Sequence, residues 1–176
     1  MPEASDEVDE IVAAWSRERP ELDFSPLQVF SRLDRLSKLA DHNRRLAFEL
    51  SGLEPWEFDV LSALSRSGEP YVMSPKSLLR QTFVSSGTMT NRIDRLVARG
   101  LVERRTDPHD RRGVLVHMTR EGLSRADAAI GALVEREREA LEGLSPADRR
   151  ALAGLLRRLG NDLRPTGASR PRAARR

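Results

Sequence analysis

Basic side chains are concentrated between residues 74 and 112. This segment holds nine basic and four acidic side chains, a local net charge of +5, whereas the whole chain of 176 residues has a net charge of +3. A local block of positive charge on a balanced chain favours a polyanionic partner such as nucleic acid. A solvated surface segment is the alternative interpretation of the same pattern.

Motifs for catalysis and for metal binding are absent from the sequence. There are no cysteines, and His42, His109 and His117 have no spacing that matches a metal site. The chain has no nucleophile elbow, no Walker A loop and no dinucleotide-binding glycine motif. We therefore expect no catalytic residues, no metal and no cofactor, and the sequence argues against an enzyme.

Residues 85–99 have the pattern of a helix with one apolar and one polar face. Met89, Ile93, Leu96 and Val97 recur at the spacing of a buried stripe, which turns the other side chains outward. An exposed Asn or Arg on such a helix can pair with adenine or guanine in the major groove, and small residues at its N-terminus suit phosphate. The predicted DNA contacts on this helix are Ser85, Ser86, Thr88, Thr90, Asn91 and Arg95, and Arg99 is also expected to face outward.

Two short alternating segments follow this helix. Residues 101–105 and 113–118 are predicted to be strands of a β-hairpin, joined by a turn that contains Asp-Pro. Asp110, Arg111 and Arg112 lie at its tip, where the Asp110 carboxylate could brace Arg112 for insertion into a narrow minor groove. Together with a preceding helix at 74–81, this order predicts a winged helix-turn-helix.

The remaining elements are expected to be long helices with apolar faces. Ser-Pro pairs at Ser25, Ser74 and Ser145 indicate helix starts, because the serine caps free backbone N–H groups and proline lacks one. The predicted helices cover residues 6–19, 25–50, 55–66, 74–81, 85–99, 120–142 and 146–161. Helices 6–50 and 120–162 could form a dimerisation bundle, although an intramolecular bundle explains their periodicity equally well.

Residues 85–122 closely resemble the recognition helix and wing of the MarR family, and the resemblance extends with less specificity over residues 8–162. It implies an α+β, mainly α fold in one domain (1–163), with a winged helix-turn-helix at 55–118. It also implies a homodimer that straddles pseudo-palindromic double-stranded DNA. The Arg-rich segment 164–176 is expected to be a disordered tail, and the acidic N-terminus and lack of a long apolar run predict a cytoplasmic protein without membrane contact.

The extra N-terminal helix resembles the urate-responsive branch of that family. Trp15, Asp59, Arg92 and Arg104 occupy the positions that characterise this branch, which implies that they bind an anionic ligand. From the residues alone, Asp59 lies on an apolar helical stripe and needs a partner, for which Arg92 is a candidate. The alternatives are a dimer-core role for Trp15, a static Asp59–Arg92 pair and a phosphate contact for Arg104.

These patterns predict a repressor that binds its operator as a dimer and is released by a small anionic effector, a urate-like purine or a carboxylate. Two alternatives stay open: a small-molecule-binding dimer, or a DNA-architectural protein, without ligand-controlled repression. An enzyme whose site has no recognisable motif is a third, and the missing nucleophile–base pair argues against it.

Overall fold

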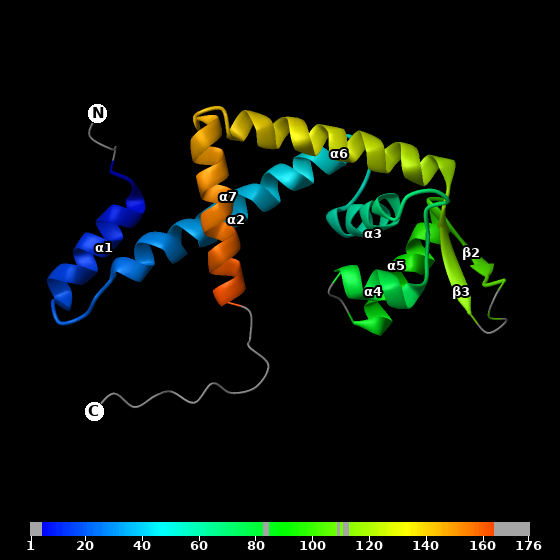
Figure 1. Cartoon of the computed structure of the whole chain (residues 1–176), viewed down its shortest axis with the longest axis horizontal. Helices are drawn as coiled ribbons and strands as arrows, with labels where there is room; N and C mark the ends of the chain where they lie inside the picture. Colours follow the sequence, from blue (N-terminus) through cyan, green and yellow to red (C-terminus); the bar gives the residue numbers. More distant parts are fainter. Residues whose placement is uncertain (1–4, 83–84, 109, 111–112, 164–176) are drawn as a thin grey trace, which may run out of the picture. The chain divides into compact units, whose positions relative to one another are not determined.

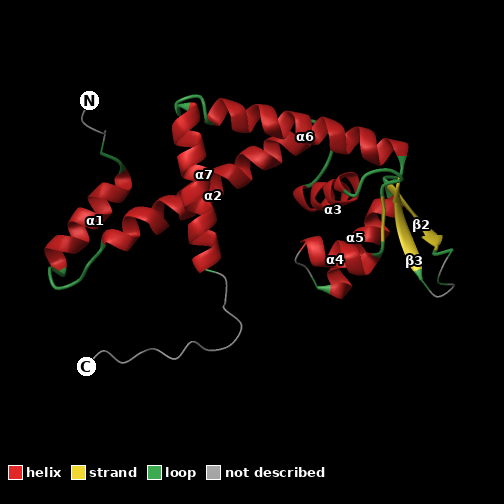
Figure 2. Ribbon diagram, viewed as in Figure 1, coloured by secondary structure: helices red, strands yellow, loops and turns green. Residues whose placement is uncertain are grey.

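The computed structural model describes residues 5–82, 85–108, 110 and 113–163. Its elements are, in chain order, α1 (Glu7–Glu18), α2 (Ser25–Glu49), α3 (Pro55–Arg66), β1 (Val72–Met73), α4 (Pro75–Thr82), α5 (Ser86–Ala98), β2 (Val102–Thr106), β3 (Val114–Met118), α6 (Arg120–Ala140) and α7 (Pro146–Asp162). Every predicted helix and both predicted strands are confirmed to within two residues (Figures 1 and 2). The mainly α, winged-helix architecture is therefore present.

The chain divides into two compact units, residues 1–136 and 137–176, and each is treated by itself. The first holds α1 to β3 and most of α6, and the second holds the end of α6 and α7. The grouping of residues 1–163 into one domain stays a prediction. Among the described helices, none is both long enough and apolar enough to cross a lipid bilayer.

The sheet is a small antiparallel one with strand order β1-β3-β2. The predicted hairpin pairs Val102 with Met118 at its base and Thr106 with Val114 towards its tip. The strand β1, which pairs Val72 with His117, was not predicted because two residues are too few to show alternation. Burial and the nearby charge of Arg105 hold the pKa of His117 below its usual value.

The core is formed by α3, α4 and α5 packed against the sheet, with the end of α2 and part of α6 covering it. Phe48 of α2 stacks on Phe58 of α3 with ring centroids 4.2 Å apart. On α5, Met89, Ile93 and Leu96 are buried as predicted. The prediction that Val97 is buried is wrong, because Val97 is 39% exposed. The buried face of α5 is narrow, and the other three side chains fill it.

Three of the helix starts depend on serine caps. The hydroxyl of Ser74 accepts from Ser77 N, that of Ser85 from Thr88 N and that of Ser145 from Asp148 N. The predicted cap at Ser25 is wrong. Ser25 lies inside α2, and its N–H and hydroxyl donate to the Asp23 carboxylate, which holds the pKa of Asp23 below its usual value.

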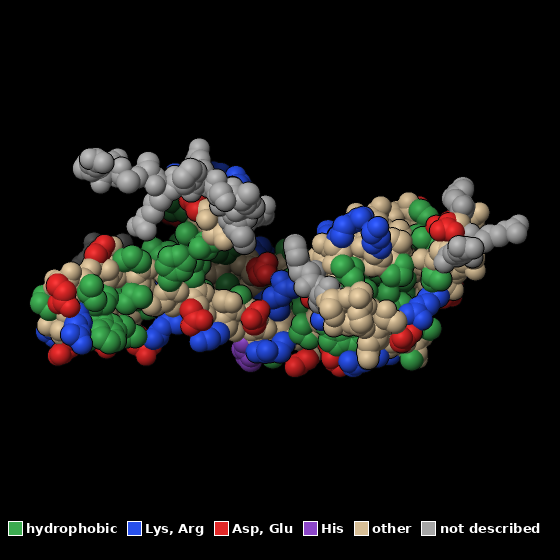
Figure 3. All heavy atoms as spheres, turned by 90° about the horizontal axis from the view of Figure 1, so that it is seen from below, with side chains coloured by type: hydrophobic (Ala, Val, Ile, Leu, Met, Phe, Trp, Pro, Cys, Tyr) green, Lys and Arg blue, Asp and Glu red, His purple; other side chains and the backbone are tan. Residues whose placement is uncertain are grey.

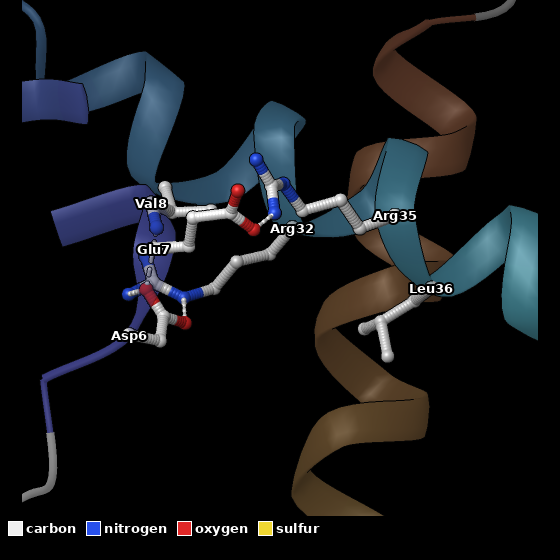
Figure 4. Close-up of a pocket in the computed structure, with 6 residues that line it drawn as sticks. All are labelled: Asp6, Glu7, Val8, Arg32, Arg35 and Leu36. Carbon is white, nitrogen blue, oxygen red and sulfur yellow. Dashed lines mark hydrogen bonds and ion pairs between the residues drawn. The ribbon is translucent and has the colours of Figure 1, made fainter. Parts of the chain in front are cut away.

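Ion pairs fix α1 on the first half of α2. Arg32 lies 2.9 Å from Asp6 and 3.0 Å from Asp9, and Arg35 pairs with Glu7 (Figure 4). The Asp6 backbone N–H and the Arg32 guanidinium together hold the pKa of Asp9 below its usual value. At the other end of α1, Trp15 stacks on Phe24 with centroids 5.9 Å apart. The extra N-terminal helix is thus held by contacts near both of its ends.

A buried ion pair joins α3 to the C-terminal end of α5. The carboxylate of Glu57 has an exposed fraction of only 1% and accepts from the Arg99 guanidinium and from the backbone N–H of Glu54. Arg99 also donates to the carbonyl of Gly52 at 2.7 Å. Arg99 is exposed as expected, and its guanidinium also compensates the buried charge of Glu57. The second oxygen of Glu57 has no hydrogen-bond partner among the described residues.

A close backbone approach joins α6 to the start of β2. Thr119 precedes α6, and its hydroxyl donates to the carbonyl of Gly100 at 2.8 Å and accepts from Gly122 N at 3.0 Å. Gly122 is buried, and a Cβ built on it would overlap the carbonyl oxygen of Leu101. Only glycine fits here, so α6 is in direct backbone contact with the base of the hairpin.

We predict that Gly122→Ala lowers the free energy of unfolding by about 1–3 kcal/mol, because backbone must move to admit the methyl group. Gly131→Ala, on the same helix, is the matched control: nothing lies within 4 Å of its Cβ position, and the substitution should raise stability by about 0.5–1 kcal/mol. Urea denaturation measures both. Equal effects of the two substitutions would contradict the close approach.

We predict that Arg99→Ala lowers the free energy of unfolding by about 2–4 kcal/mol at pH 7, because it leaves the buried Glu57 carboxylate without its counter-charge. Urea denaturation measures this loss.

The control for this prediction is Arg125→Ala. Arg125 pairs with the exposed Glu121 at 2.6 Å and is as exposed as Arg99, at 37%, so its removal should cost less than about 1 kcal/mol. Urea denaturation at pH 7 compares the two variants. An equally small loss in both would contradict the compensating role assigned to Arg99.

Candidate nucleic-acid interface and ligand cleft

The helix α5 presents the predicted polar row to solvent. Ser85, Ser86, Thr88, Thr90, Asn91 and Arg95 are all exposed. The first turn is ordered by its own hydroxyls: Ser85 Oγ lies 2.8 Å from Thr88 Oγ1, and Thr90 donates to the carbonyl of Ser86 at 3.1 Å. The side chain of Ser85 therefore caps the N-terminal end of this thirteen-residue helix.

A shallow hollow of about 410 Å³ lies against this row. It is lined by Trp56 from α3 and by Gly87, Thr88, Asn91, Arg92 and Arg95 from α5. Arg95 lies over the Trp56 ring, 4.5 Å from its centroid, and Arg92 lies 5.7 Å from the same centroid. Polar groups that can donate to base edges or to phosphates thus converge on one face of α5.

The hairpin lies next to α5 in the fold, and its base is tied to that helix. Arg104 of β2 pairs with Asp94 of α5 at 2.6 Å. At the tip, Asp110 is exposed and its carbonyl accepts from Gly113 N at 2.8 Å. The predicted contacts Arg111 and Arg112 lie outside the described residues.

The structure does not bring the four predicted ligand residues together. Asp59 pairs with Arg44 of α2 at 3.6 Å, so the predicted Asp59–Arg92 pair is wrong. The Asp59 side chain is 45% exposed, so water solvates part of its carboxylate. The desolvation penalty that the prediction assigned to an unpaired carboxylate is therefore much smaller. Arg92 lies against Trp56 and Arg104 is paired with Asp94.

Trp15 is far from Asp59 within one chain. Trp15 stacks on Phe24, which precedes α2, whereas Asp59 contacts Arg44 near the other end of that helix. Twenty residues of helix correspond to about 30 Å at roughly 1.5 Å per residue. A single protomer therefore cannot place both side chains on one small ligand.

Asp59 instead lines a cleft of about 380 Å³ formed by α2, α3, α4 and α6. Its wall carries two cations, Arg44 and Arg66, and the apolar side chains of Phe58, Ile130 and Leu133. Ser62, Gln81 and Thr82 add hydrogen-bonding groups. Two guanidinium groups beside an apolar floor suit a planar anion of small size. Among the described residues, no group of acidic or histidine side chains could hold a metal ion.

Sequence reasoning missed four residues that shape these sites: Glu54, Glu57, Trp56 as a partner of arginine, and Arg44. Glu57 accepts from the backbone N–H of Glu54 at the start of α3, which is one half of a capping box. The partners of these residues lie far away in the chain, and nothing in the spacing identifies them.

The sequence profile of the MarR family matches residues 51–113, which run from α3 to the hairpin. The HTH-type transcriptional regulator PecS of Dickeya dadantii is 36% identical over 157 residues, covering 89% of this chain and 95% of the relative.

Two solved structures extend the likeness. One describes the regulation of DNA binding of Bordetella bronchiseptica BpsR by 6-hydroxynicotinic acid; it has 30% identity and a TM-score of 0.65, and covers 80% of this chain and 97% of that one. The other, an Escherichia coli MarR mutant complexed with operator DNA, has 25% identity and a TM-score of 0.65, with coverages of 88% and 99%. The chain therefore belongs to the MarR family, and it is a winged-helix, DNA-binding transcription regulator and not an enzyme.

Proposed function

We propose that this regulator is a repressor that binds a pseudo-palindromic operator as a homodimer and is released by a small anionic effector. The observation that carries the proposal is the exposed row on α5, in which Thr88, Asn91 and Arg95 lie on one face beside a hollow, next to the hairpin. The likeness to a MarR mutant bound to operator DNA supports placing this row in the major groove.

The roles of the interface residues follow from their chemistry. Arg95 and Asn91 carry the groups that pair bidentately with guanine and adenine. Thr88 and Thr90 lie on the same exposed row and would read or position bases. Ser85 and Ser86 lie at the N-terminal end of α5, where hydroxyls and free N–H groups suit a phosphate. Asp110, Arg111 and Arg112 would contact the adjacent minor groove, with Asp110 orienting an arginine.

Exposed apolar side chains support a homodimer. Leu36 and Leu39 of α2 are each 61% exposed, and Leu155 of α7 is 54% exposed. Figure 3 shows hydrophobic side chains gathered on one face over α1 and the first half of α2. Apolar surface of this extent on a regulator favours an interface, and a second copy is the partner that a pseudo-palindrome requires.

The cleft lined by Arg44, Asp59 and Arg66 is the best-supported effector site. An anion bound there would compete with Asp59 for Arg44 and so change the contact between α2 and α3. A coupling of about 1–3 kcal/mol would lower DNA affinity about 5- to 150-fold. The resemblance to the urate-responsive branch and the regulation of BpsR by 6-hydroxynicotinic acid both favour a planar aromatic anion. Trp15 can join this site only from a second copy.

Substitutions in the proposed DNA interface test the repressor function. Arg95→Ala should reduce affinity most for one set of base pairs, because a bidentate base contact is worth about 1–3 kcal/mol. Arg112→Ala should weaken binding to all duplexes and flatten the log–log salt slope by about one unit. Gel shifts over a salt series, with duplexes selected from a randomised library by the unsubstituted protein, measure both.

Two results would overturn this proposal. One is a monomer in sedimentation experiments at the concentrations used for binding. The other is failure to bind duplexes even at low ionic strength, which would favour a small-molecule-binding dimer without DNA control. Binding without sequence preference would favour the DNA-architectural alternative.

Substitutions around the cleft test the effector site. Urate, xanthine, salicylate, 6-hydroxynicotinate and tricarboxylates should include at least one compound that raises the melting temperature and releases DNA. Arg44→Ala should abolish that shift, whereas Arg45→Ala, an exposed neighbour that does not line the cleft, should keep it. A shift that survives Arg44→Ala but is lost in Arg104→Ala would place the site at the sequence-predicted residues instead.

A further inference from the structure

Three side chains form a closed set of contacts where the start of α3 meets the middle of α5. One carboxylate oxygen of Glu54 accepts from Arg95 Nη2 at 3.2 Å, and the other accepts from the indole N–H of Trp56. The Arg95 guanidinium in turn lies over the Trp56 ring, 4.5 Å from its centroid. Glu54 and Trp56 together form the Arg95 clamp.

The clamp is attached to the rigid part of the fold. The backbone N–H of Glu54 donates to the buried carboxylate of Glu57 at 3.0 Å, and Glu57 is paired with Arg99 at the C-terminal end of α5. The two clamp residues and the arginine that they hold are therefore fixed to the same buried ion pair. The Glu54 carboxylate restricts the Arg95 guanidinium at its edge, and the Trp56 ring restricts it at its face.

Stabilisation of the fold does not explain these contacts. The Glu54 and Arg95 side chains are 57% and 55% exposed, and ion pairs with that exposure contribute little to stability. Their position does have a consequence for binding, because Trp56 and Arg95 both line the hollow on the exposed row of α5. A long arginine side chain loses much rotamer freedom when it binds, and a side chain ordered beforehand loses less.

The charge of Glu54 also bears on what Arg95 can bind. Arginine has five N–H donors, and Glu54 occupies only part of this set, so donors stay available for a guanine edge. A phosphate group, by contrast, would bring its negative charge close to the Glu54 carboxylate. The clamp thus favours a neutral base edge over the DNA backbone as the partner of Arg95.

We propose that Glu54 and Trp56 are positioning residues for DNA recognition: they hold Arg95 in the orientation that contacts a base and keep it from binding phosphate. This inference rests on the proposed role of Arg95 as a base contact. It assigns to the start of α3 a part in sequence discrimination without direct contact to DNA.

The test compares Glu54→Gln with Glu103→Gln. Glu103 is 55% exposed and pairs with Arg105 at 2.9 Å on the hairpin, so its substitution removes the same charge from the same surface without touching Arg95. The probes are a duplex selected from a randomised library by the unsubstituted protein, single-base variants of it and mixed-sequence DNA. Discrimination is the ratio of the affinities for the selected duplex and a variant.

Glu54→Gln should reduce discrimination about three- to tenfold at the base pairs where Arg95→Ala also reduces it, a part of the effect of a bidentate contact. Its affinity for mixed-sequence DNA should stay equal or rise, since a repulsive carboxylate is gone. Glu103→Gln should leave discrimination unchanged. Trp56→Phe, which keeps an aromatic face but removes the indole N–H, should fall between Glu54→Gln and the unsubstituted protein.

A second measurement follows Arg95 directly. Relaxation of its side-chain Nε–H signal in the free protein should show faster motion in Glu54→Gln than in Glu103→Gln. Unchanged discrimination and unchanged Arg95 mobility in Glu54→Gln would overturn the clamp while leaving Arg95 as a base contact. If Arg95→Ala itself leaves discrimination unchanged, the role of Arg95 in the proposed function fails instead.

Discussion

The buried ion pair between Glu57 and Arg99 is the constraint on which the orientation of α5 depends. A carboxylate with an exposed fraction of 1% is tolerated only beside a counter-charge, and Arg99 at the end of α5 supplies it. Arg99 also donates to Gly52, so one side chain ties α5 to the turn before α3 and to α3 itself. The polar row on α5 projects from a helix whose C-terminal end is fixed in this way.

The same helix α3 takes part in both the proposed DNA interface and the proposed effector cleft. Its first residues, with Glu54 just before them, contact Arg95 on the exposed side of α5, and Asp59, little more than one turn along, pairs with Arg44 of α2. The apolar side of α3 is buried in the core, where Phe58, Val60, Leu61 and Leu64 are nearly inaccessible. A helix packed in this way resists bending, so a displacement of α3 at Asp59 would also displace Glu54 at its start.

How much the sequence predicts depends on the range of the interaction. Helices were predicted because apolar periodicity and Ser-Pro starts are local, and the hairpin because alternation surrounds an Asp-Pro turn. The partners of charged side chains were not predicted. Asp59 with Arg44, and Glu57 with Arg99, join different helices, and a chain with 30 Lys and Arg against 27 Asp and Glu offers many pairs of opposite charge. The exposed row on α5 could be predicted because it lies opposite the apolar side chains whose spacing also predicted the helix.

The position of α6 completes the physical link between the cleft and the hairpin. Gly122 brings the start of α6 into backbone contact with Leu101 at the base of β2, and about two to three turns later Ile130 and Leu133 line the cleft with Arg44 and Asp59. A bound anion would therefore contact α6 as well as α2 and α3. Because Thr119 donates to the carbonyl of Gly100, directly after α5, the start of α6 and the end of α5 are held at a common point. The cleft and the proposed DNA-contacting elements are joined through α3, α4 and α6, so an anion in the cleft would act on α5 and the hairpin through these helices.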